Sequence, residues 1–343
     1  MQRVSSLFAI AAALVSVSAA AQDSDVVYFN SDSVSAVLLG DWGGQDAAPY
    51  AEVGQLATVP GLTAVVTQVN AQLALLLGDN FYSSGIHSDE HDARFVETFE
   101  QVYNSSVLEA IPYYVIAGNH DHKGNVSAQI AYSQLSSRWH FDDYYYKKSF
   151  VFSPSSERNM TIDIIFIDTV LLAGNSDDLE DKFGTLPGPI DADWAETQWS
   201  WIQASLRDST ADYLFTAGHY PVWSGCSHGP TDILVDRLKP MLEQYGATGH
   251  LSGHDHCLEY IDEGLGPVYP LSGAGDNCCY DNTNADKVPE GAMKFAIWND
   301  GTGSPIEGGF AIMTANATEV VFEYFAANAT RLFTSNPVKP RTH

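Results

Sequence analysis

The chain has 343 residues, of which 45% are hydrophobic and 12% aromatic, so it can bury a large core. Its 43 acidic and 16 basic residues leave a formal net charge of −27 at pH 7. That balance argues against a nucleic-acid scaffold or an anionic membrane as a partner, because both bind through clustered lysine and arginine.

The pattern of residues 1–21, at the start of the chain, predicts a secretory signal peptide. Arg3 supplies a charged start, residues 7–17 are apolar, and an A-x-A site ends at Ala21. No later stretch reaches the roughly 18 uninterrupted apolar residues of a transmembrane helix, so we expect no membrane span. We expect a secreted protein, or one in the lumen of an acidic compartment such as a lysosome or vacuole. Residues 22–343 are expected to form a single domain and a monomer.

Five apolar runs predict buried strands, and most of them stop at a glycine followed by a polar residue. In chain order they are SAVLLGDW, LALLLGDN, YYVIAGNH, YLFTAGHY and HLSGHD. Helical spacing predicts two helices between them, one through Ala195, Trp199, Ile202 and Leu206 and one through Leu234, Leu238, Met241 and Tyr245. The last segment, FAIMTANATEVVFEYF, predicts a hairpin with Asn316 near its turn. This alternation favours a layered α/β domain, in which ligands gather beyond the carboxyl ends of the strands.

Cysteines and glycosylation sequons both fit an oxidising, secretory compartment. Because neighbouring cysteines rarely bridge each other, we expect Cys257 to pair with Cys278 or Cys279 and Cys226 to take the other. Reactive or metal-binding thiols are the alternative. The five N-x-[ST] sequons are at Asn104, Asn125, Asn159, Asn316 and Asn328.

Oxygen and nitrogen donors follow all five predicted strand ends. They are Asp41, Asp79 with Tyr82, Asn119 with His120, His219, and His254 with His256. A single aspartate in such a place usually caps a helix or a turn, but five successive sites suggest two neighbouring cations that share one carboxylate, with Asp79 as the candidate bridge. His254 and His256 are two residues apart, so on an extended segment they share a face and can serve two different metals.

The blocks GDWG, GDNFY, GNHDH, GHYPVWS and SGHDH resemble, in order and separation, those of the metallophosphoesterase superfamily. The chain is most similar to the purple acid phosphatases, in their tartrate-resistant, type 5 branch. The resemblance continues through GNVSAQIAYS, GNSDD and PLSGAG. It implies a four-layer α/β/β/α sandwich with two mixed β-sheets, formed by one calcineurin-like catalytic domain over residues 22–343.

The resemblance also implies a dinuclear Fe(III)–M(II) centre. The Fe(III) ligands would be Asp41, Asp79, Tyr82 and His256, and the ligands of the second ion would be Asp79, Asn119, His219 and His254. Iron is the expected second ion, with zinc or manganese as alternatives. The first block lacks the histidine of an Asp-x-His motif, so Tyr82 would supply the missing ligand as a phenolate; the alternative is a packed tyrosine with a hydrogen-bonded hydroxyl.

By the same resemblance the chain is expected to be a secreted acid phosphatase that hydrolyses phosphate monoesters in acid through a metal-bound hydroxide. His120 and His228 match family histidines beside the metals and are expected to protonate the leaving alkoxide and orient the phosphate. Alternatives are a phosphodiesterase or nucleotide phosphatase on the same core, or a non-catalytic iron-binding glycoprotein.

Three further aspartates are expected to have structural roles, and two segments differ from the family pattern. Asp121 and Asp255 are expected to brace their loops and Asp168 to be structural. Ala173 stands where many animal members have a cysteine, so the family disulfide cannot be transferred. The loop of residues 176–190 has one basic residue, Lys182, so we do not expect activation by trypsin-like cleavage.

Overall fold

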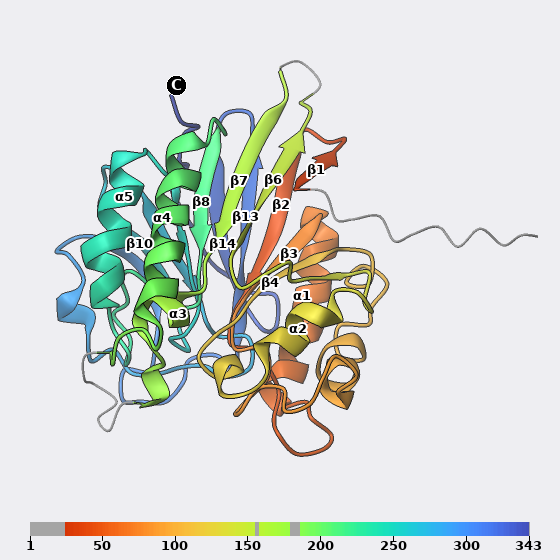
Figure 1. The fold of residues 1–343 in the computed structure, drawn as a ribbon. Helices are drawn as coiled ribbons and strands as arrows, with labels where there is room; N and C mark the ends of the chain where they lie inside the picture. The colour runs from red at the N-terminus through yellow and green to blue at the C-terminus, as the bar shows by residue number, and fades with distance from the viewer. Residues whose placement is uncertain (1–24, 155–157, 179–185, 343) are drawn as a thin grey trace, which may run out of the picture.

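Figure 1 shows the fold in a computed structural model, which describes residues 25–154, 158–178 and 186–342. The expected signal peptide lies outside the described residues, as does Lys182 in the 176–190 loop. None of the helices within the described ranges has the length and apolarity needed to span a bilayer.

Two mixed β-sheets form the centre of the molecule. In spatial order the eight-stranded sheet contains β1 (Val26–Phe29), β6 (Tyr146–Phe152), β7 (Met160–Phe166), β8 (Tyr213–Ala217), β9 (Gly249–Leu251), β11 (Val268–Ser272), β10 (Leu258–Asp262) and β12 (Met293–Ile297). The seven-stranded sheet contains β15 (Arg331–Thr334), β14 (Val320–Ala326), β13 (Gly309–Asn316), β2 (Ser33–Leu39), β3 (Leu73–Leu77), β4 (Tyr113–Ile116) and β5 (Trp139–His140). Strands β2 to β5 run parallel, as do β7, β8 and β9.

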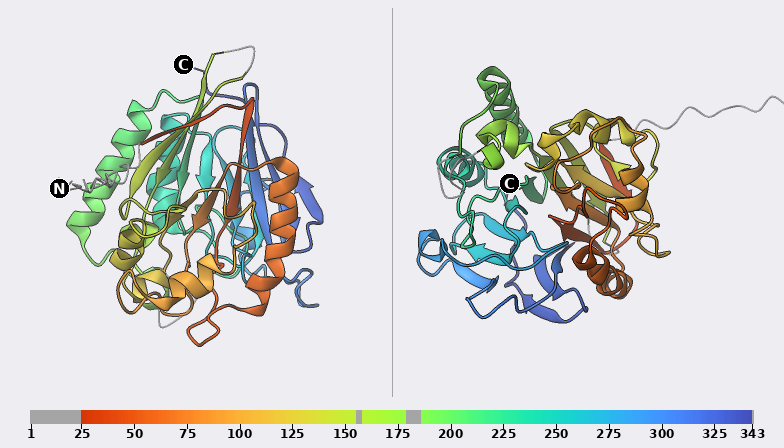
Figure 2. Two further views of the ribbon diagram at one scale, coloured as in Figure 1. Left: turned by 90° about the vertical axis from the view of Figure 1, so that its right-hand side faces the viewer. Right: turned by 90° about the horizontal axis from the view of Figure 1, so that it is seen from below.

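Helices cover the outer faces of both sheets, and Figure 2 shows α4 and α1 on opposite sides of the strands. The seven-stranded sheet carries α1 (Val53–Val69) and α2 (Val126–Tyr132), and the eight-stranded sheet carries α3 (Thr169–Ala173), α4 (Ala192–Asp208) and α5 (Lys239–Gln244). Shorter helical segments are η1 (Phe95–Glu100), η2 (Asp121–Lys123), η3 (Ser176–Asp178), η4 (Leu234–Leu238) and η5 (Ala285–Lys287). The expected four-layer α/β/β/α sandwich is therefore confirmed.

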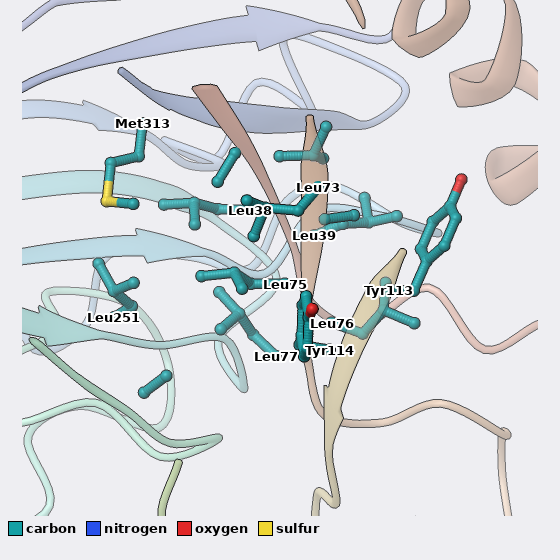
Figure 3. Close-up of a cluster of buried hydrophobic side chains, with 14 of the residues drawn as sticks. Leu38, Leu39, Leu73, Leu75, Leu76, Leu77, Tyr113, Tyr114, Leu251 and Met313 are labelled. Carbon is teal, nitrogen blue, oxygen red and sulfur yellow. The ribbon is translucent and has the colours of Figure 1, made fainter. Parts of the chain in front are cut away.

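The main core lies between the two sheets, where leucine side chains of β2 and β3 meet residues such as Leu251 and Met313 (Figure 3). All five residues of β3 are buried, because a helix layer covers one face of the sheet and the second sheet covers the other. Burial of each of its four leucine side chains contributes about 1.5–3 kcal/mol. The uninterrupted LALLL run thus reflects a strand with no solvent-facing side.

The predicted helices and hairpin are confirmed. Helix α4 buries the four residues of the helical pattern, and the second pattern forms η4 followed by α5. Strands β13 and β14 pair antiparallel. At their turn Asn316 Oδ1 accepts a hydrogen bond from the backbone N–H of Thr318 at 2.8 Å.

The expected disulfide pairing is wrong. Cys226 pairs with Cys257, and the adjacent Cys278 and Cys279 pair with each other. The first bridge follows from the way two strand-end loops meet. Asp255 accepts hydrogen bonds from the Ser224 hydroxyl and the backbone N–H of His228 and Gly229, which brings the loop of Cys226 against that of Cys257. Sequence spacing does not reveal this contact.

Candidate metal centre

The carboxyl ends of strands from both sheets meet at one edge of the molecule. Backbone hydrogen bonds join the two sheets there, from Gly40 N to Ser272 O at 2.9 Å and from Gly275 N to Gly40 O at 3.1 Å. Beyond these ends, Asp41, Asp79 and His254 have positive φ angles of 58°, 52° and 75°. Non-glycine residues adopt this conformation rarely, and strained backbone of this kind is concentrated at functional sites.

Glycines let these loops approach one another. A Cβ atom at Gly118 would overlap the Asp79 carboxylate, and one at Gly253 would overlap the Asp41 carboxylate. These two glycines therefore leave space for a carboxylate from a neighbouring loop.

Asp41, Tyr82 and His256 form one side of the cluster. The Tyr82 hydroxyl lies 3.0 Å from Asp41 Oδ1 and 3.0 Å from His256 Nε2. His256 Nε2 is 3.6 Å from Asp41 Oδ1. Asp41 Oδ2 also accepts a hydrogen bond from the backbone N–H of His254 at 2.8 Å, which ties this side to the SGHDH loop.

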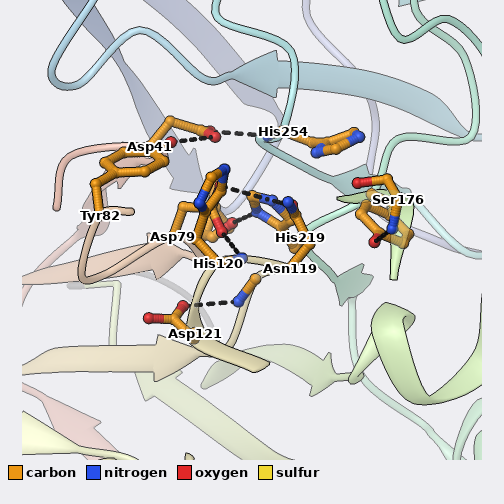
Figure 4. A network of polar contacts seen from close by, with 12 residues as sticks. Asp41, Asp79, Tyr82, Asn119, His120, Asp121, Ser176, His219 and His254 are labelled. Atoms are coloured by element: carbon orange, nitrogen blue, oxygen red, sulfur yellow. Dashed lines mark hydrogen bonds and ion pairs between the residues drawn. The ribbon is translucent and has the colours of Figure 1, made fainter. Parts of the chain in front are cut away.

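Asp79, Asn119 and His219 form the other side (Figure 4). His219 Nε2 is 3.3 Å from Asp79 Oδ2 and 2.9 Å from Asn119 Oδ1, and its Nδ1 lies 2.8 Å from the carbonyl oxygen of Leu77. The ring of His254 is centred 5.0 Å from that of His219. A backbone carbonyl at the second ring nitrogen is one of the usual partners that orient a metal-binding histidine.

The structure thus gathers all seven sequence-predicted donors in one place, and the two sides meet where the carboxylates of Asp41 and Asp79 approach each other. Donor atoms of Asp41, Asp79 and His219 lie within 4.8 Å of one another and can surround a cation. His256 Nε2, the ring nitrogen turned toward Asp41 and Tyr82, is the atom of this imidazole that can reach a cation there. Carboxylate, phenol, amide and imidazole donors suit iron or zinc, so the residues present fit a dinuclear metal centre.

The electrostatics of the cluster favour positive charge. Burial raises the pKa of Asp41 well above its usual range, and Asp79 adds to this. Burial also raises the pKa of Tyr82, again with help from Asp41 and Asp79. Burial alone would lower the pKa of His219, but Asp79 and Asp41 raise it to about 10. Several oxygen ligands packed together without solvent require a cation before all of them can ionise.

The two candidate catalytic histidines lie beside the cluster. His120 Nδ1 is 2.6 Å from the carbonyl oxygen of Ser83, and its ring contacts that of Tyr82 at 4.7 Å between centroids. His120 Nε2 lies 3.7 Å from Asp177 Oδ2. The His228 ring stacks on His254 at 4.2 Å. Both histidines therefore border the same space, one on each side of the donors.

Three other residues support the site but were not singled out from the sequence. The buried guanidinium of Arg94 donates hydrogen bonds to the carbonyl oxygens of Tyr82, Gly43 and Gly85. The Tyr280 ring stacks on His256 at 4.4 Å. Asp177 accepts a hydrogen bond from Asn119 Nδ2 at 2.9 Å. Asp177 lies in the GNSDD block and could have been found there, whereas Arg94 and Tyr280 belong to no recognisable motif.

The structural expectations for three aspartates are confirmed. Asp121 accepts hydrogen bonds from the backbone N–H of Gly118 and Asn80, so it braces the loops that carry two donors. Asp255 holds the loop of His228, as described above. Asp168 caps α3 and pairs with His122 Nε2 at 2.7 Å.

Comparison with known proteins agrees with this geometry. Residues 35–258 match the calcineurin-like phosphoesterase family model. The chain is 42% identical to the tartrate-resistant acid phosphatase type 5 of Rattus norvegicus over 306 residues, which cover 89% of this chain and 90% of the relative. It is 42% identical to the Homo sapiens protein of the same name over 297 residues, covering 87% and 88%.

Solved structures show the same fold at lower identity. GAP50, described as the anchor in the inner membrane complex of Plasmodium, has a TM-score of 0.73 at 20% identity and covers 91% of this chain and 90% of its own. The purple acid phosphatase PPD1 of Lupinus luteus has a TM-score of 0.56 at 14% identity, covering 89% of this chain and 53% of its own.

Proposed function

This chain belongs to the calcineurin-like phosphoesterase family and is an acid phosphatase of the tartrate-resistant, type 5 branch; on that premise we propose that it hydrolyses phosphate monoesters at a dinuclear Fe(III)–M(II) centre. The observation that carries the proposal is the convergence of seven donor side chains from loops of both sheets. The N-terminal pattern supports secretion, or delivery to an acidic lumen, as part of the same proposal.

The two sides of the cluster suggest how the ions divide the donors. In this proposal Fe(III) takes Asp41, Asp79, Tyr82 and His256, and the second ion takes Asp79, Asn119, His219 and His254. Iron is the proposed second ion, with zinc or manganese as alternatives. A bound metal pair would supply Lewis acidity that activates water and stabilises charge on phosphorus oxygens.

The side chains around the donors would complete the reaction. Because His120 Nδ1 faces the Ser83 carbonyl, its Nε2 faces the centre and is placed to give a proton to an oxygen of the ester. His228 lies across the cluster and can hold the phosphate or the leaving oxygen from the other side. Asn119 and Asp177 are joined by a hydrogen bond, which limits the rotation of the Asn119 amide.

A visible spectrum with metal analysis tests the proposal. Phenolate bound to Fe(III) absorbs visible light, so the iron-loaded protein should be coloured and Tyr82→Phe should lose that absorption. Tyr269→Phe is the matched control, because the Tyr269 hydroxyl is buried without a hydrogen-bond partner among the described residues. A colourless wild-type protein that contains zinc alone, or a Tyr82→Phe variant with an unchanged spectrum, would contradict the assignment.

A further inference from the structure

A cavity of 420 Å³ lies beside the candidate centre. His228 and His254 line it, so it adjoins the donors directly. Ser176 lines it as well, and Figure 4 places Ser176 on the side of His219 that faces away from Tyr82. An ester whose phosphate lies at the metals can therefore extend its leaving group into this cavity.

Part of the cavity wall is apolar. Among the residues that line it are Leu172, Leu186, Pro189, Pro230 and Ile233. Such a surface favours an alcohol with an apolar body, because binding removes the apolar area of that body from water.

Two carboxylates add negative charge to the same cavity. Asp232 and Asp236 both line it, are exposed, and have no ion-pair partner among the described residues. They are four positions apart on one helical segment and therefore lie on the same face of it. The nearby Arg237 is directed to Glu196 instead, through two hydrogen bonds. No lysine or arginine of the described residues lines the cavity.

We propose that this cavity is a leaving-group pocket selective for phosphate monoesters whose alcohol carries a cationic group on an apolar body. The inference rests on the proposed function, since it concerns the departing half of the same reaction: water adds to phosphorus, the bond from phosphorus to the ester oxygen breaks, and the alcohol leaves with a proton. Nucleotides with further phosphate groups would place anions against Asp232 and Asp236 and are disfavoured.

Isosteric substrates test the charge preference. The probes are 4-(trimethylammoniomethyl)phenyl phosphate, its neutral isostere 4-neopentylphenyl phosphate, and the anionic 4-(carboxymethyl)phenyl phosphate, compared by kcat/KM at about pH 5 and low ionic strength. For each protein, kcat/KM of the cationic ester is divided by kcat/KM of the neutral ester. The quotient of this ratio in the wild type over that in the double variant Asp232→Asn/Asp236→Asn cancels the intrinsic difference in reactivity between the phenols. We expect this quotient to be about three- to tenfold and to fall with added salt, as for charges near a surface.

A charge-matched variant separates a local effect from a change in net charge. Glu97→Gln/Glu109→Gln removes two carboxylates from the α1 side of the molecule, and it should keep the wild-type ratio. The product phenols provide a second measurement without turnover, since the cationic phenol should bind the wild type more tightly than the double aspartate variant does. If all three esters are hydrolysed and the quotient between wild type and double variant is one, the proposed leaving-group pocket is wrong and the proposed function stands. No turnover of any ester by the metal-loaded protein would overturn the proposed function and the pocket with it.

Discussion

Asp79 is the residue on which the two halves of the cluster depend. Its Oδ2 lies 3.3 Å from His219 Nε2, and its Oδ1 accepts a hydrogen bond from the backbone N–H of His120 at 3.0 Å. Burial opposes ionisation of this carboxyl, but the pairing with His219 outweighs burial and lowers its pKa. Pairing with His219 therefore favours the carboxylate form of Asp79, the form that a bridge between two cations requires.

Replacement of Asp79 by alanine should abolish phosphate release at about pH 5. We expect a loss of more than about 100-fold, because removal even of residues that only support a metal ligand costs 10–100-fold. Asp79→Asn provides the isosteric version, and a thermal melt checks that each variant folds. The exposed carboxylate of Asp286 offers a control, since Asp286→Asn should keep wild-type turnover. Near-normal activity of a folded Asp79→Ala protein would count against the shared-ligand assignment.

The strand-end loops are the elements that set the geometry of the site, and Arg94 holds two of them together. Its side chain lies just before η1, donates to the carbonyl oxygens of Gly43 and Tyr82, and pairs with Asp46 at 3.2 Å. Gly43 belongs to the loop after β2 and Tyr82 to the loop after β3. One buried guanidinium thus fixes the position of a candidate ligand relative to the loop of Asp41.

We predict that Arg94→Lys weakens iron binding about 10- to 100-fold and diminishes the visible absorption, because a single ammonium cannot reach the same acceptors. Metal titration followed by the spectrum measures both effects. Arg138→Lys is the matched control: Arg138 is also buried, but it pairs with Glu100 away from the donors. Equal spectral changes in the two variants would show that general destabilisation, rather than loop position, is responsible.

At the scale of the whole molecule, charge connects stability to pH. The chain carries a formal net charge of −27 at pH 7, so the electrostatic repulsion within the folded chain falls as the pH falls.

Glu259 on β10 adds a local contribution to the pH dependence of stability. Burial, with a further effect of Asp255, raises its pKa to about 8, so the folded protein keeps it protonated while the unfolded chain ionises near pH 4.5. The unfolded state then binds fewer protons, and stability decreases as the pH rises between these values.

Glu259→Gln should remove this dependence, because glutamine stays neutral and can still accept the hydrogen bond from the backbone N–H of Gly225. We expect the free energy of unfolding of the wild type to fall on the order of 2 kcal/mol more than that of the variant between pH 5 and pH 7. Denaturant unfolding at several pH values measures the difference, with Glu109→Gln as the control for lost surface charge. Parallel curves for the wild type and Glu259→Gln would show that this carboxyl does not contribute.

The sequence by itself determined the chain order of the strands and helices around the candidate centre, and it singled out the seven donor-type side chains that the structure brings together there. Each apolar run and the polar residues directly after it are local patterns, and local patterns survive in a linear sequence. The fold class also followed, through the resemblance of five short blocks.

Only the tertiary structure decided which distant segments touch. Three contacts depend on loops that meet across the two sheets. They are the Cys226–Cys257 disulfide, the hydrogen bond from Arg94 to the carbonyl oxygen of Tyr82, and the cavity that Asp232 and Asp236 line together with His228. The physical reason is that such contacts are fixed by how layers pack and how loops close over them, and residues that make them have no characteristic spacing along the chain.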